Sequence, residues 1–330
     1  MKSKNILVVG GAGYIGSHMV KELLEAGHSP ITLDNLSRGN QDLIPGGQFI
    51  KGDLSDSVFL NRVFSENKID AVMHFAADAQ VGESVEKPLK YYRNNIACTI
   101  NLLETMVKKN VLKFIFSSTA AVYGEPINTP ITEDHPFNPT NPYGRTKLTV
   151  EHMLHDCDIA HGLKSVCLRY FNAAGADASG VFGERHTPET HLIPLVLKVA
   201  SKELKDIRIF GTDYSTQDGT CVRDYIHVTD LAQAHLLSMD ALFAGEPSNY
   251  FNLGNSKGHS VKEVIQTAER VTGKPISYIE TARRPGDPAL LIADSNKIRT
   301  VLGWQPLYED LDVIIDTAWK WEQKESQRKK

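Results

Sequence analysis

A short apolar run that ends in glycines constrains the fold of this chain more than any other segment. Residues 5–9 read Asn-Ile-Leu-Val-Val, and residues 10–16 continue with Gly-Gly-Ala-Gly-Tyr-Ile-Gly. The β-branched run followed by helical periodicity predicts a strand, a tight turn and a helix. Glycine accepts positive φ and lets the backbone approach a ligand closely. The start of a helix presents N–H groups and a positive dipole, so we expect a phosphate site here.

Two glycine spacings fit this turn. The first, Gly11-x-Gly13-x-x-Gly16, is the usual dinucleotide-binding fingerprint, and the second is Gly10-x-x-Gly13-x-x-Gly16. An ordinary strand-to-helix connection has the same local pattern. The residues of the turn therefore leave the choice open, and the rest of the chain has to decide it.

The first half of the chain alternates strands with helices. We expect strands at 5–9, 30–33, 48–50, 71–75, 113–116 and 165–168. We expect helices at 14–26, after a cap at Ser55 or Asp56, at 91–109 and at 143–161. This alternation predicts an α/β fold, a Rossmann-like doubly wound parallel sheet with right-handed crossovers. Such sheets bind ligands at the carboxyl ends of their strands, where polar residues gather in this chain.

After Asn172 the elements become shorter and loops dominate. We expect helical residues at 195–199, strands at 207–210 and 250–253, a helix capped by Thr229 or Asp230, another after Ser260, and a last helix through Trp321. The predicted division is therefore a first domain at 1–172 and a smaller mixed α/β lobe at 173–330, with some later segments returning to the first domain.

Composition excludes several classes of function. The chain of 330 residues carries a formal net charge of −4, so it lacks the basic field of a nucleic-acid-binding protein. Its apolar runs are too short to span a membrane. The cysteines are scattered and predict reduced thiols in a cytoplasmic protein, with neither a disulfide framework nor a metal site: Cys98, Cys157, Cys167 and Cys221.

Two aspartates follow consecutive predicted strands. Asp34 ends the second strand, where a carboxylate accepts hydrogen bonds from ribose hydroxyls and repels a 2′-phosphate. This position favours NAD over NADP. Asp53 follows the third strand, where a contact with adenine and a role at the approach to the next helix are both open.

Tyr143 and Lys147 lie four residues apart and therefore share one helical face. A free tyrosine has a pKa of about 10 and is a poor base at neutral pH. A neighbouring lysine cation, together with the positive nicotinamide ring of NAD⁺, would favour the phenolate. Thr119, at the end of the fifth strand, offers a hydroxyl to the same hydrogen-bond network.

Further segments extend the pattern over the chain from residue 5 to about Trp321. They are Gly10-Gly-Ala-Gly-Tyr-Ile-Gly-Ser-His18, Leu33-Asp-Asn35, Val81-Gly-Glu-Ser84, Ser117-Ser-Thr-Ala-Ala-Val-Tyr-Gly124, Tyr143-x-x-x-Lys147, Arg169-Tyr-Phe-Asn172, residues 218–228 and Arg283-Arg-Pro-Gly-Asp287. Together these segments resemble the extended short-chain dehydrogenase/reductase family, and within it the enzymes that invert UDP-hexoses at C4. This resemblance selects Gly10, Gly13 and Gly16 as the glycine set.

The resemblance implies an isomerase with tightly bound NAD that interconverts UDP-galactose and UDP-glucose through a 4-keto intermediate. Tyr143 would be the base, Lys147 would bind the nicotinamide ribose and favour the phenolate, and Thr119 would bind the sugar hydroxyl. The resemblance also implies a homodimer formed by the helices near 91–109 and 143–161.

Family positions extend the two predicted ligand sites. The cofactor set is Gly10, Gly13, Tyr14, Ile15, Gly16, Asp34, Asn35, Asp53, Leu54, Phe75, Ala76, Ala77, Asn94, Ser117, Tyr143, Lys147, Tyr170 and Phe171. The substrate set is Thr119, Tyr143, Asn172, His191, Leu192, Phe210, Arg223, Arg284, Asp287 and Leu291. Guanidinium groups match phosphate geometry, which suits Arg223 and Arg284 to the diphosphate. Asp224 and His227 look catalytic by type, but we expect structural roles for both.

Three positions depart from the family pattern. Ala79 replaces a lysine that many members use to reach the NAD pyrophosphate, and His191 replaces a common asparagine. Leu291 occupies the position that gates the sugar pocket, which leaves N-acetylated UDP-sugars possible as substrates.

Two alternative functions share this fold. A nucleotide-sugar 4,6-dehydratase needs an Asp-Glu pair directly after Thr119, where this chain has Ala120 and Ala121. A non-catalytic NAD-sensing module would not need Tyr143, Lys147 and the two arginines together.

Overall fold

The computed structural model describes residues 2–284 and 286–328. The chain forms two compact units, each assembled from separate stretches. Unit 1 consists of Met1–Gly124, Pro136–Arg169 and Ala232–Phe251, and unit 2 of Glu125–His135, Tyr170–Leu231 and Asn252–Lys330.

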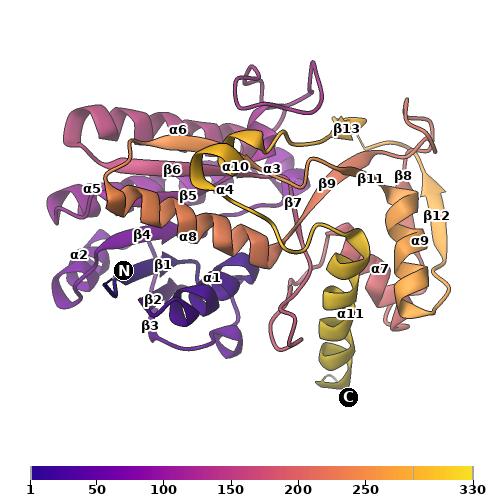
Figure 1. The fold of residues 1–330 in the computed structure, drawn as a ribbon, viewed down its shortest axis with the longest axis horizontal. Helices are drawn as coiled ribbons and strands as arrows, with labels where there is room; N and C mark the ends of the chain where they lie inside the picture. The colour runs from indigo at the N-terminus through magenta and orange to yellow at the C-terminus, as the bar shows by residue number, and fades with distance from the viewer. Residues whose placement is uncertain (1, 285, 329–330) are drawn as a thin grey trace. The chain divides into compact units, whose positions relative to one another are not determined.

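A seven-stranded sheet forms the centre of unit 1 (Figure 1). Its strands are β1 (Asn5–Val9), β2 (Ser29–Asp34), β3 (Gln48–Lys51), β4 (Ala71–His74), β5 (Lys113–Thr119), β6 (Lys164–Tyr170) and β10 (Asn249–Leu253). The order is β10-β6-β5-β4-β1-β2-β3, and β1 pairs in parallel with both β2 and β4. The predicted Rossmann-like fold is confirmed. The chain winds in opposite directions from β1 and β4, and such a switch point opens a ligand crevice.

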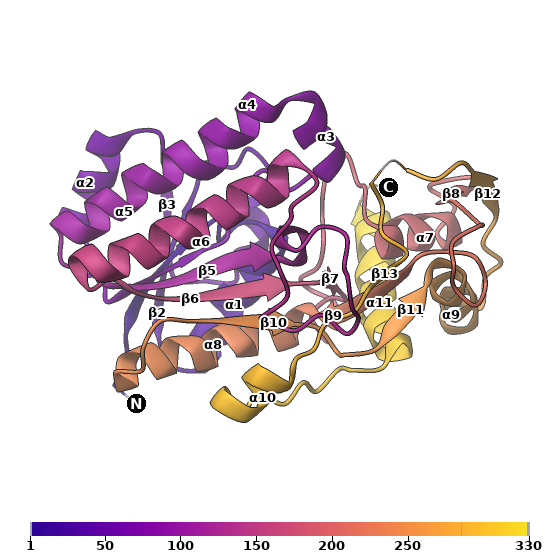
Figure 2. The same cartoon turned by 90° about the horizontal axis from the view of Figure 1, so that it is seen from above.

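Helices cover both faces of this sheet. They are α1 (Tyr14–Glu25), α2 (Ser57–Glu66), α3 (Val81–Glu86), α4 (Pro88–Tyr91), α5 (Cys98–Lys108), α6 (Pro142–His161) and α8 (Val228–Ala244). Figure 2 shows α5 and α6 side by side on one face of the sheet and α8 on the other. On the first face, apolar side chains of the strands pack with those of α2, α5 and α6, among them Leu60, Leu102 and Val150.

The local signals placed most of these helices correctly. Asp56 caps α2 by accepting a hydrogen bond from the Phe59 N–H at 2.9 Å, as expected. The helix expected at 91–109 is more complex, because α4 and α5 are joined by a π-helical turn at Tyr92–Ala97. A π-helical turn has few local sequence signals, and such turns often occur at functional sites.

Unit 2 contains two smaller sheets. In one, β9 (Val222–His227) lies between β11 (Gly258–Ser260) and β13 (Leu290–Leu291) and also pairs with β7 (Asn172–Ala174). The other pairs β8 (Ile207–Phe210) with β12 (Tyr278–Thr281). Helices α7 (Leu192–Ala200), α9 (Val261–Thr272) and α11 (Leu311–Arg328) share an apolar core, and α10 (Asn296–Leu302) follows β13 in the chain.

One predicted helix cap in unit 2 is wrong. Helix α8 begins at Val228, so Thr229 and Asp230 lie inside its first turn. The carboxylate of Asp230 instead accepts hydrogen bonds from the N–H groups of Leu307 and Tyr308, at 2.8 and 3.0 Å. The carboxylate that the local pattern assigned to a helix cap therefore forms tertiary hydrogen bonds instead. The helix expected after Ser260 is confirmed: α9 begins at Val261, and Ser260 forms a reciprocal capping box with Glu263.

Two expectations from composition can be compared with the structure. Within residues 2–284 and 286–328, no helix is both long enough and apolar enough to cross a membrane. The four cysteines are free thiols, and Cys98, Cys167 and Cys221 are buried.

Candidate active site

The glycine turn between β1 and α1 is sterically demanding. Gly10 has a φ of +80°, and a Cβ built there would lie 2.5 Å from the backbone nitrogen of Ala76. A Cβ at Gly16 would lie 2.2 Å from the carbonyl oxygen of Gly10. Real Cβ atoms do not approach backbone this closely. The packing of the turn against itself and against the chain after β4 therefore requires glycine at both positions.

Gly13 is different. Its φ of −80° is ordinary, and a Cβ there would meet the Gly10 carbonyl oxygen at 3.3 Å, a tight contact but not an impossible one. As the N-cap residue of α1, it has no side chain with which to satisfy the first N–H groups of the helix. An anion at this helix start can accept those hydrogen bonds, and the bare backbone lets it come close. The predicted residues Tyr14 and Ile15 begin this helix.

Asp34 connects the end of β2 to the glycine turn. Its carboxylate accepts hydrogen bonds from the N–H groups of Ala12, at 3.0 Å, and Leu36, at 2.8 Å. Burial raises the pKa of Asp34, and these two hydrogen bonds oppose that change. The carboxylate is therefore held in a fixed position beside the turn, where a ribose would lie if a dinucleotide phosphate bound at α1.

The other cofactor candidates near this edge also come together. Asn35 donates a hydrogen bond to the Asp53 carboxylate at 2.7 Å, and hydrogen bonds from Ser55 and Asn35 lower the pKa of Asp53. Leu54 is buried next to it. After β4, the N–H groups of Phe75 and Ala76 donate to the Val9 carbonyl, and Ala77 follows. The glycine turn has no room for a Cβ at Gly10 or Gly16, and the Asp34 carboxylate is buried beside this turn. Both features fit an adenine dinucleotide.

Tyr143, Lys147 and Thr119 are brought together at the end of β5. Tyr143 is half-buried and hydrogen-bonds to Thr119. The Nζ of Lys147 is buried, lies 6.0 Å from the centre of the Tyr143 ring and donates to the Ser117 carbonyl at 2.7 Å. Helix α6 provides the tyrosine and the lysine from one face. Its N-cap residue, Asn141, accepts a hydrogen bond from the Gly144 N–H at 2.9 Å.

The pKa of Tyr143 departs from the expected direction. Burial raises it, and the hydrogen bond with Thr119 only partly opposes this. Burial also lowers the pKa of Lys147 to about 7, against the charge of Glu151. Among the groups of the chain itself, the loss of hydration on burial therefore outweighs the stabilisation of the phenolate by Thr119.

Glu151 is a residue of this site that the sequence analysis missed. It lies one turn beyond Lys147 on α6, accepts a hydrogen bond from Ser118 and forms a buried ion pair with Arg169, whose Nη2 lies 2.7 Å from Oε2. Arg169 also donates to the Tyr123 hydroxyl at 2.8 Å. Glu151 therefore places a negative charge one helical turn from Lys147, on the side away from Tyr143 along α6. Its i+4 spacing from Lys147 is the local signal that could have found it.

Asn95, in the π-helical turn, was also missed. Its side chain exchanges hydrogen bonds with the backbone of Asp78, at 2.9 and 3.0 Å, and donates to the Thr146 hydroxyl at 3.1 Å. It thus joins the loop after β4 to the residue before Lys147. The predicted cofactor residue Asn94 donates to the Asn95 side chain at 3.1 Å. We identify Asn95 as a positioning residue.

Lys90, a cation that follows the unusual Ala79 by eleven positions, is already paired. Lys90 Nζ lies 3.1 Å from the carboxylate of Asp78 and 2.9 Å from that of Glu83. Burial opposes the charge of Lys90, but these two carboxylates outweigh it and raise the pKa. Ala79 itself is exposed. Lys90 is therefore not a simple substitute for the usual lysine.

Unit 2 brings several substrate candidates together around β9. Arg223 is buried, and its guanidinium forms an ion pair with the carboxylate of Asp287. Leu291 pairs with Arg223 in the register between β13 and β9, and Asn172 on β7 pairs with Tyr225. Since side chains alternate along a strand, Arg223 and Tyr225 point to the same face of the sheet.

A second pair of candidates lies at the end of β8. The Arg284 guanidinium carbon lies 3.8 Å from the centre of the Phe210 ring, a stacked geometry that arginine favours. The Asp287 N–H donates to the Arg284 carbonyl at 3.3 Å. Asp287 therefore contacts Arg284 through its backbone and Arg223 through its carboxylate. The adjacent Arg283 pairs with Asp213 instead, at 2.7 Å.

The remaining predicted residues of unit 2 lie elsewhere. His191 caps the start of α7, directly before Leu192, and its Nδ1 lies 2.6 Å from the Glu184 carboxylate. Burial lowers the pKa of His191, but the nearby carboxylates outweigh burial and raise it to about 10. Tyr170 ends β6, and the Phe171 N–H donates to the Leu253 carbonyl at 3.0 Å.

Asp224 and His227 have the contacts of structural residues, as expected. The Asp224 carboxylate is fully buried and accepts three backbone hydrogen bonds, from Asn255, Ser256 and Ala293. The His227 ring stacks on Tyr308 with centroids 4.4 Å apart.

The glycine turn leads to a test of cofactor binding. Replacing Gly16 by alanine should strip the purified protein of bound NAD, because the added carbon collides with rigid backbone. Gly27→Ala is the matched control: its φ is +79°, and the described residues leave the space around its Cβ open. It should cost about 1–2 kcal/mol of stability and keep the cofactor. Nucleotide released on denaturation is measured by chromatography, with circular dichroism as the check of folding. A wild-type NAD content in Gly16→Ala would contradict the assignment.

Comparisons with known proteins agree with this geometry. The model of the NAD dependent epimerase/dehydratase family matches residues 6–254. A UDP-glucose 4-epimerase of Halalkalibacterium halodurans is 54% identical over 316 residues, which cover 96% of this chain and 95% of the relative. The crystal structure of UDP-glucose 4-epimerase from Bifidobacterium longum with NAD⁺ and UDP is 42% identical and superposes with a TM-score of 0.93, covering 98% of this chain and 99% of that one.

A third similar protein is the UDP-Glc/GlcNAc 4-epimerase of Campylobacter jejuni, whose structure is 45% identical and superposes with a TM-score of 0.86. The match covers 98% of this chain and 100% of that one. Both the sequence and the fold thus agree over nearly the whole length. The chain belongs to the NAD dependent epimerase/dehydratase family.

Proposed function

We propose that this chain catalyses the reversible C4 epimerisation of UDP-galactose and UDP-glucose with a tightly bound NAD. The observation that carries the proposal is the placement of Tyr143, hydrogen-bonded to Thr119 and beside Lys147, in the same unit as the glycine turn. The activity named for the relatives supports the same reaction.

Tyr143 acts as the acid and base of this reaction. Its phenolate oxygen accepts the proton of the sugar 4-hydroxyl, and later returns a proton to the 4-keto oxygen after the sugar has turned over. Thr119 orients that hydroxyl, and Lys147 holds the ribose next to the reacting ring. A bound NAD would supply the hydride acceptor for C4 and the hydride donor for the return step. The configuration at C4 is thereby inverted with no net oxidation.

The substrate has to be held by its UDP part while its sugar turns. Arg223 and Arg284 are assigned to the diphosphate, where planar guanidinium groups form paired hydrogen bonds. Asn172 is assigned to the diphosphate as well, Asp287 to the uridine ribose and Phe210 to the uracil. The ion pair of Arg223 with Asp287 keeps both side chains in place before the substrate arrives. His191 and Leu192 are the remaining proposed substrate contacts.

By function, residues 1–172 would hold NAD and contribute Thr119, Tyr143 and Asn172 to the substrate site. Residues 173–330 would hold most of the UDP-sugar, with some later segments returning to the first domain. We place the reaction in the cytoplasm, where four free thiols are stable.

The decisive assay uses purified protein, UDP-galactose and no added cofactor. UDP-glucose should appear, because bound NAD is regenerated in each cycle. A parallel reaction with UDP-N-acetylgalactosamine tests whether Leu291 leaves room for the acetyl group. A protein that contains NAD yet forms no UDP-glucose contradicts the proposal, and a 4-keto-6-deoxy product would identify a dehydratase.

The role of Tyr143 has a separate test. Tyr143→Phe should retain NAD but lose about 10²–10⁴-fold in kcat, because it removes the hydroxyl that transfers the proton. The control, Tyr278→Phe, removes a hydroxyl from a tyrosine that is 45% exposed, and it should keep the wild-type rate. If Tyr143→Phe turns over at the full rate, Tyr143 is not the base.

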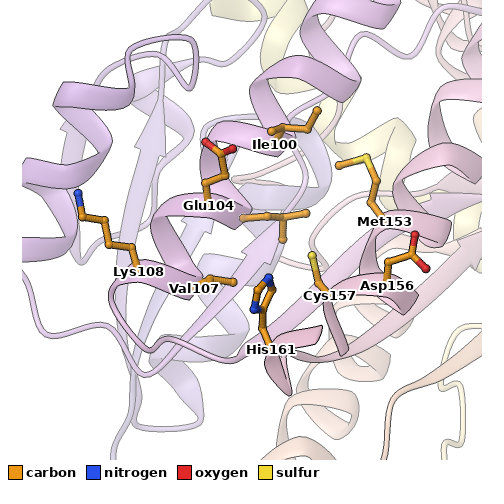
Figure 3. A pocket seen from close by; sticks show the side chains of 9 residues that line it. Ile100, Glu104, Val107, Lys108, Met153, Asp156, Cys157 and His161 are labelled. Atoms are coloured by element: carbon orange, nitrogen blue, oxygen red, sulfur yellow. The ribbon is translucent and has the colours of Figure 1, made fainter. Parts of the chain in front are cut away.

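We also propose that the chain forms a homodimer through α5 and α6. A groove of about 430 Å³ lies between these helices, and Figure 3 shows side chains of both helices around it. Its lining is Ile100, Leu103, Glu104, Val107, Lys108, Met153, Asp156, Cys157 and His161. The centre is apolar, while acidic and basic groups both lie around it. A second copy related by a two-fold axis can match such a surface with itself.

This interface can be tested by its oligomeric state. Ile100, 39% exposed on α5, should break the dimer when replaced by glutamate, because the charge would be buried against the partner. Val301→Glu, at an exposed apolar position of α10, is the control and should remain dimeric. Sedimentation equilibrium measures both. A monomeric wild type, or a dimer that survives Ile100→Glu, contradicts the proposed interface.

A further inference from the structure

Four side chains of metal-ligand type converge in the segment before α7. One ligand atom from each of Glu184, His186, Glu189 and His191 lies within 4.8 Å of the other three. His186 Nδ1 lies 2.9 Å from Glu184 and 3.8 Å from Glu189, and His191 Nδ1 lies 2.6 Å from Glu184 and 3.0 Å from Glu189. Each imidazole thus faces both carboxylates through the same ring nitrogen.

Burial makes this arrangement unusual. The side chains of Glu184 and Glu189 are only 7% and 3% exposed, so two carboxylates have been removed from water within one small space. Two such charges repel each other and need a positive charge beside them, which either a protonated imidazole or a bound cation can supply. The half-exposed imidazoles point into that space rather than away from it. A cation at the centre would satisfy all four groups.

The backbone around the four groups is well supported. The Trp321 indole N–H donates to the Glu184 carbonyl at 2.9 Å, and Arg185, the next residue, pairs with Glu325 of α11 at 2.6 Å. Oε1 of Glu189 also accepts the backbone N–H groups of Thr190 and His191, at 2.7 and 2.9 Å. Second contacts of this kind orient metal ligands in known sites.

An open pocket of unit 2 gives access to the cluster. Glu184, His186 and Glu189 line it, together with Trp321 and Glu325 of α11. The pocket therefore provides space next to three of the four ligand residues.

We propose that Glu184, His186, Glu189 and His191 form a binding site for a divalent transition-metal ion, with Zn²⁺ as the best match. Zn–N and Zn–O bonds of about 2.0–2.1 Å in a tetrahedron place ligand atoms about 3.3–3.4 Å apart. The four N–O separations range from 2.6 to 3.8 Å and the four ligand atoms lie within 4.8 Å of one another, so the side chains would adjust their positions to reach that spacing. Ca²⁺ and Mg²⁺ prefer oxygen-only ligand sets, whereas imidazole nitrogen selects ions such as Zn²⁺.

The ion has a structural role in this proposal. Its four ligands come from an eight-residue segment that ends at the N-cap of α7, so binding would fix this segment against the helix start. Such an ion binds the folded chain alone and therefore stabilises it. The proposal does not depend on the identity of the UDP-sugar.

The test uses the full chain without a histidine tag, first treated with a chelator and then titrated with Zn²⁺ by calorimetry. We expect one Zn²⁺ per chain and a higher melting temperature with the metal. His186→Gln and Glu189→Gln should each weaken binding at least about tenfold. His152→Gln and Glu66→Gln are the controls, because they change exposed residues of the same types on α6 and α2. Affinities of both ligand variants equal to the wild-type value would overturn the site.

A spectroscopic measurement keeps the proposal testable if a variant fails to fold. Co²⁺ added to the wild-type chain should give the strong visible absorption of a four-coordinate site, and Zn²⁺ should displace it. A spectrum unchanged from that of aqueous Co²⁺, together with no stoichiometric binding of either metal, would show that the four side chains are held by hydrogen bonds alone. A weak six-coordinate spectrum of bound Co²⁺ would contradict the four-ligand site.

Discussion

The interior behind the candidate active site depends on one buried carboxylate. Glu151 pairs with Arg169, accepts a hydrogen bond from Ser118, and its charge acts on Lys147 from one helical turn away. Without it, two buried cations would have no counter-charge, which costs far more than a surface pair contributes. Tyr143, Lys147 and Glu151 follow one another at intervals of four residues on α6. One face of α6 thus carries the Tyr143 hydroxyl at one end and the buried Glu151–Arg169 ion pair two turns further on.

Features that depend on local pattern were predictable. Strand β1, helix α1 and the glycine turn follow from adjacent residues, and the Tyr143–Lys147 pair follows from helical spacing. Arg169 lies 18 positions after Glu151 in the chain, so the pairing of their charges becomes visible only when β6 and α6 pack together. The π-helical turn at Tyr92–Ala97 escaped prediction for another reason. Its sequence is an ordinary helical one, and the insertion is stabilised by tertiary contacts of Asn95.

In unit 2 the residue types were easier to predict than their partners. Family position predicted Arg223 and Asp287 as two separate substrate contacts. It did not predict that their side chains form an ion pair with each other. Asp230 was expected to cap a helix, and instead it holds the backbone at Leu307 and Tyr308. The expectation that the chain has no metal site rested on scattered cysteines. It did not consider that Glu184, His186, Glu189 and His191, unevenly spaced, could converge in one loop. The hydrogen-bond partner of a short polar side chain depends on which groups the tertiary fold places near it, and local sequence does not show those groups.

The two catalytic candidates of α6 show why such packing matters for function. Burial raises the pKa of Tyr143 and lowers that of Lys147, so the site disfavours an isolated charge on either side chain. Each pKa unit corresponds to about 1.4 kcal/mol. A phenolate beside an ammonium group is a different case, because in a poorly hydrated space opposite charges stabilise each other more strongly than in water. Dehydration that suppresses each ion alone therefore strengthens the pair. A phenolate at Tyr143 is therefore favoured most when Lys147 is charged and a further positive group, such as the nicotinamide ring of a bound NAD⁺, lies beside both.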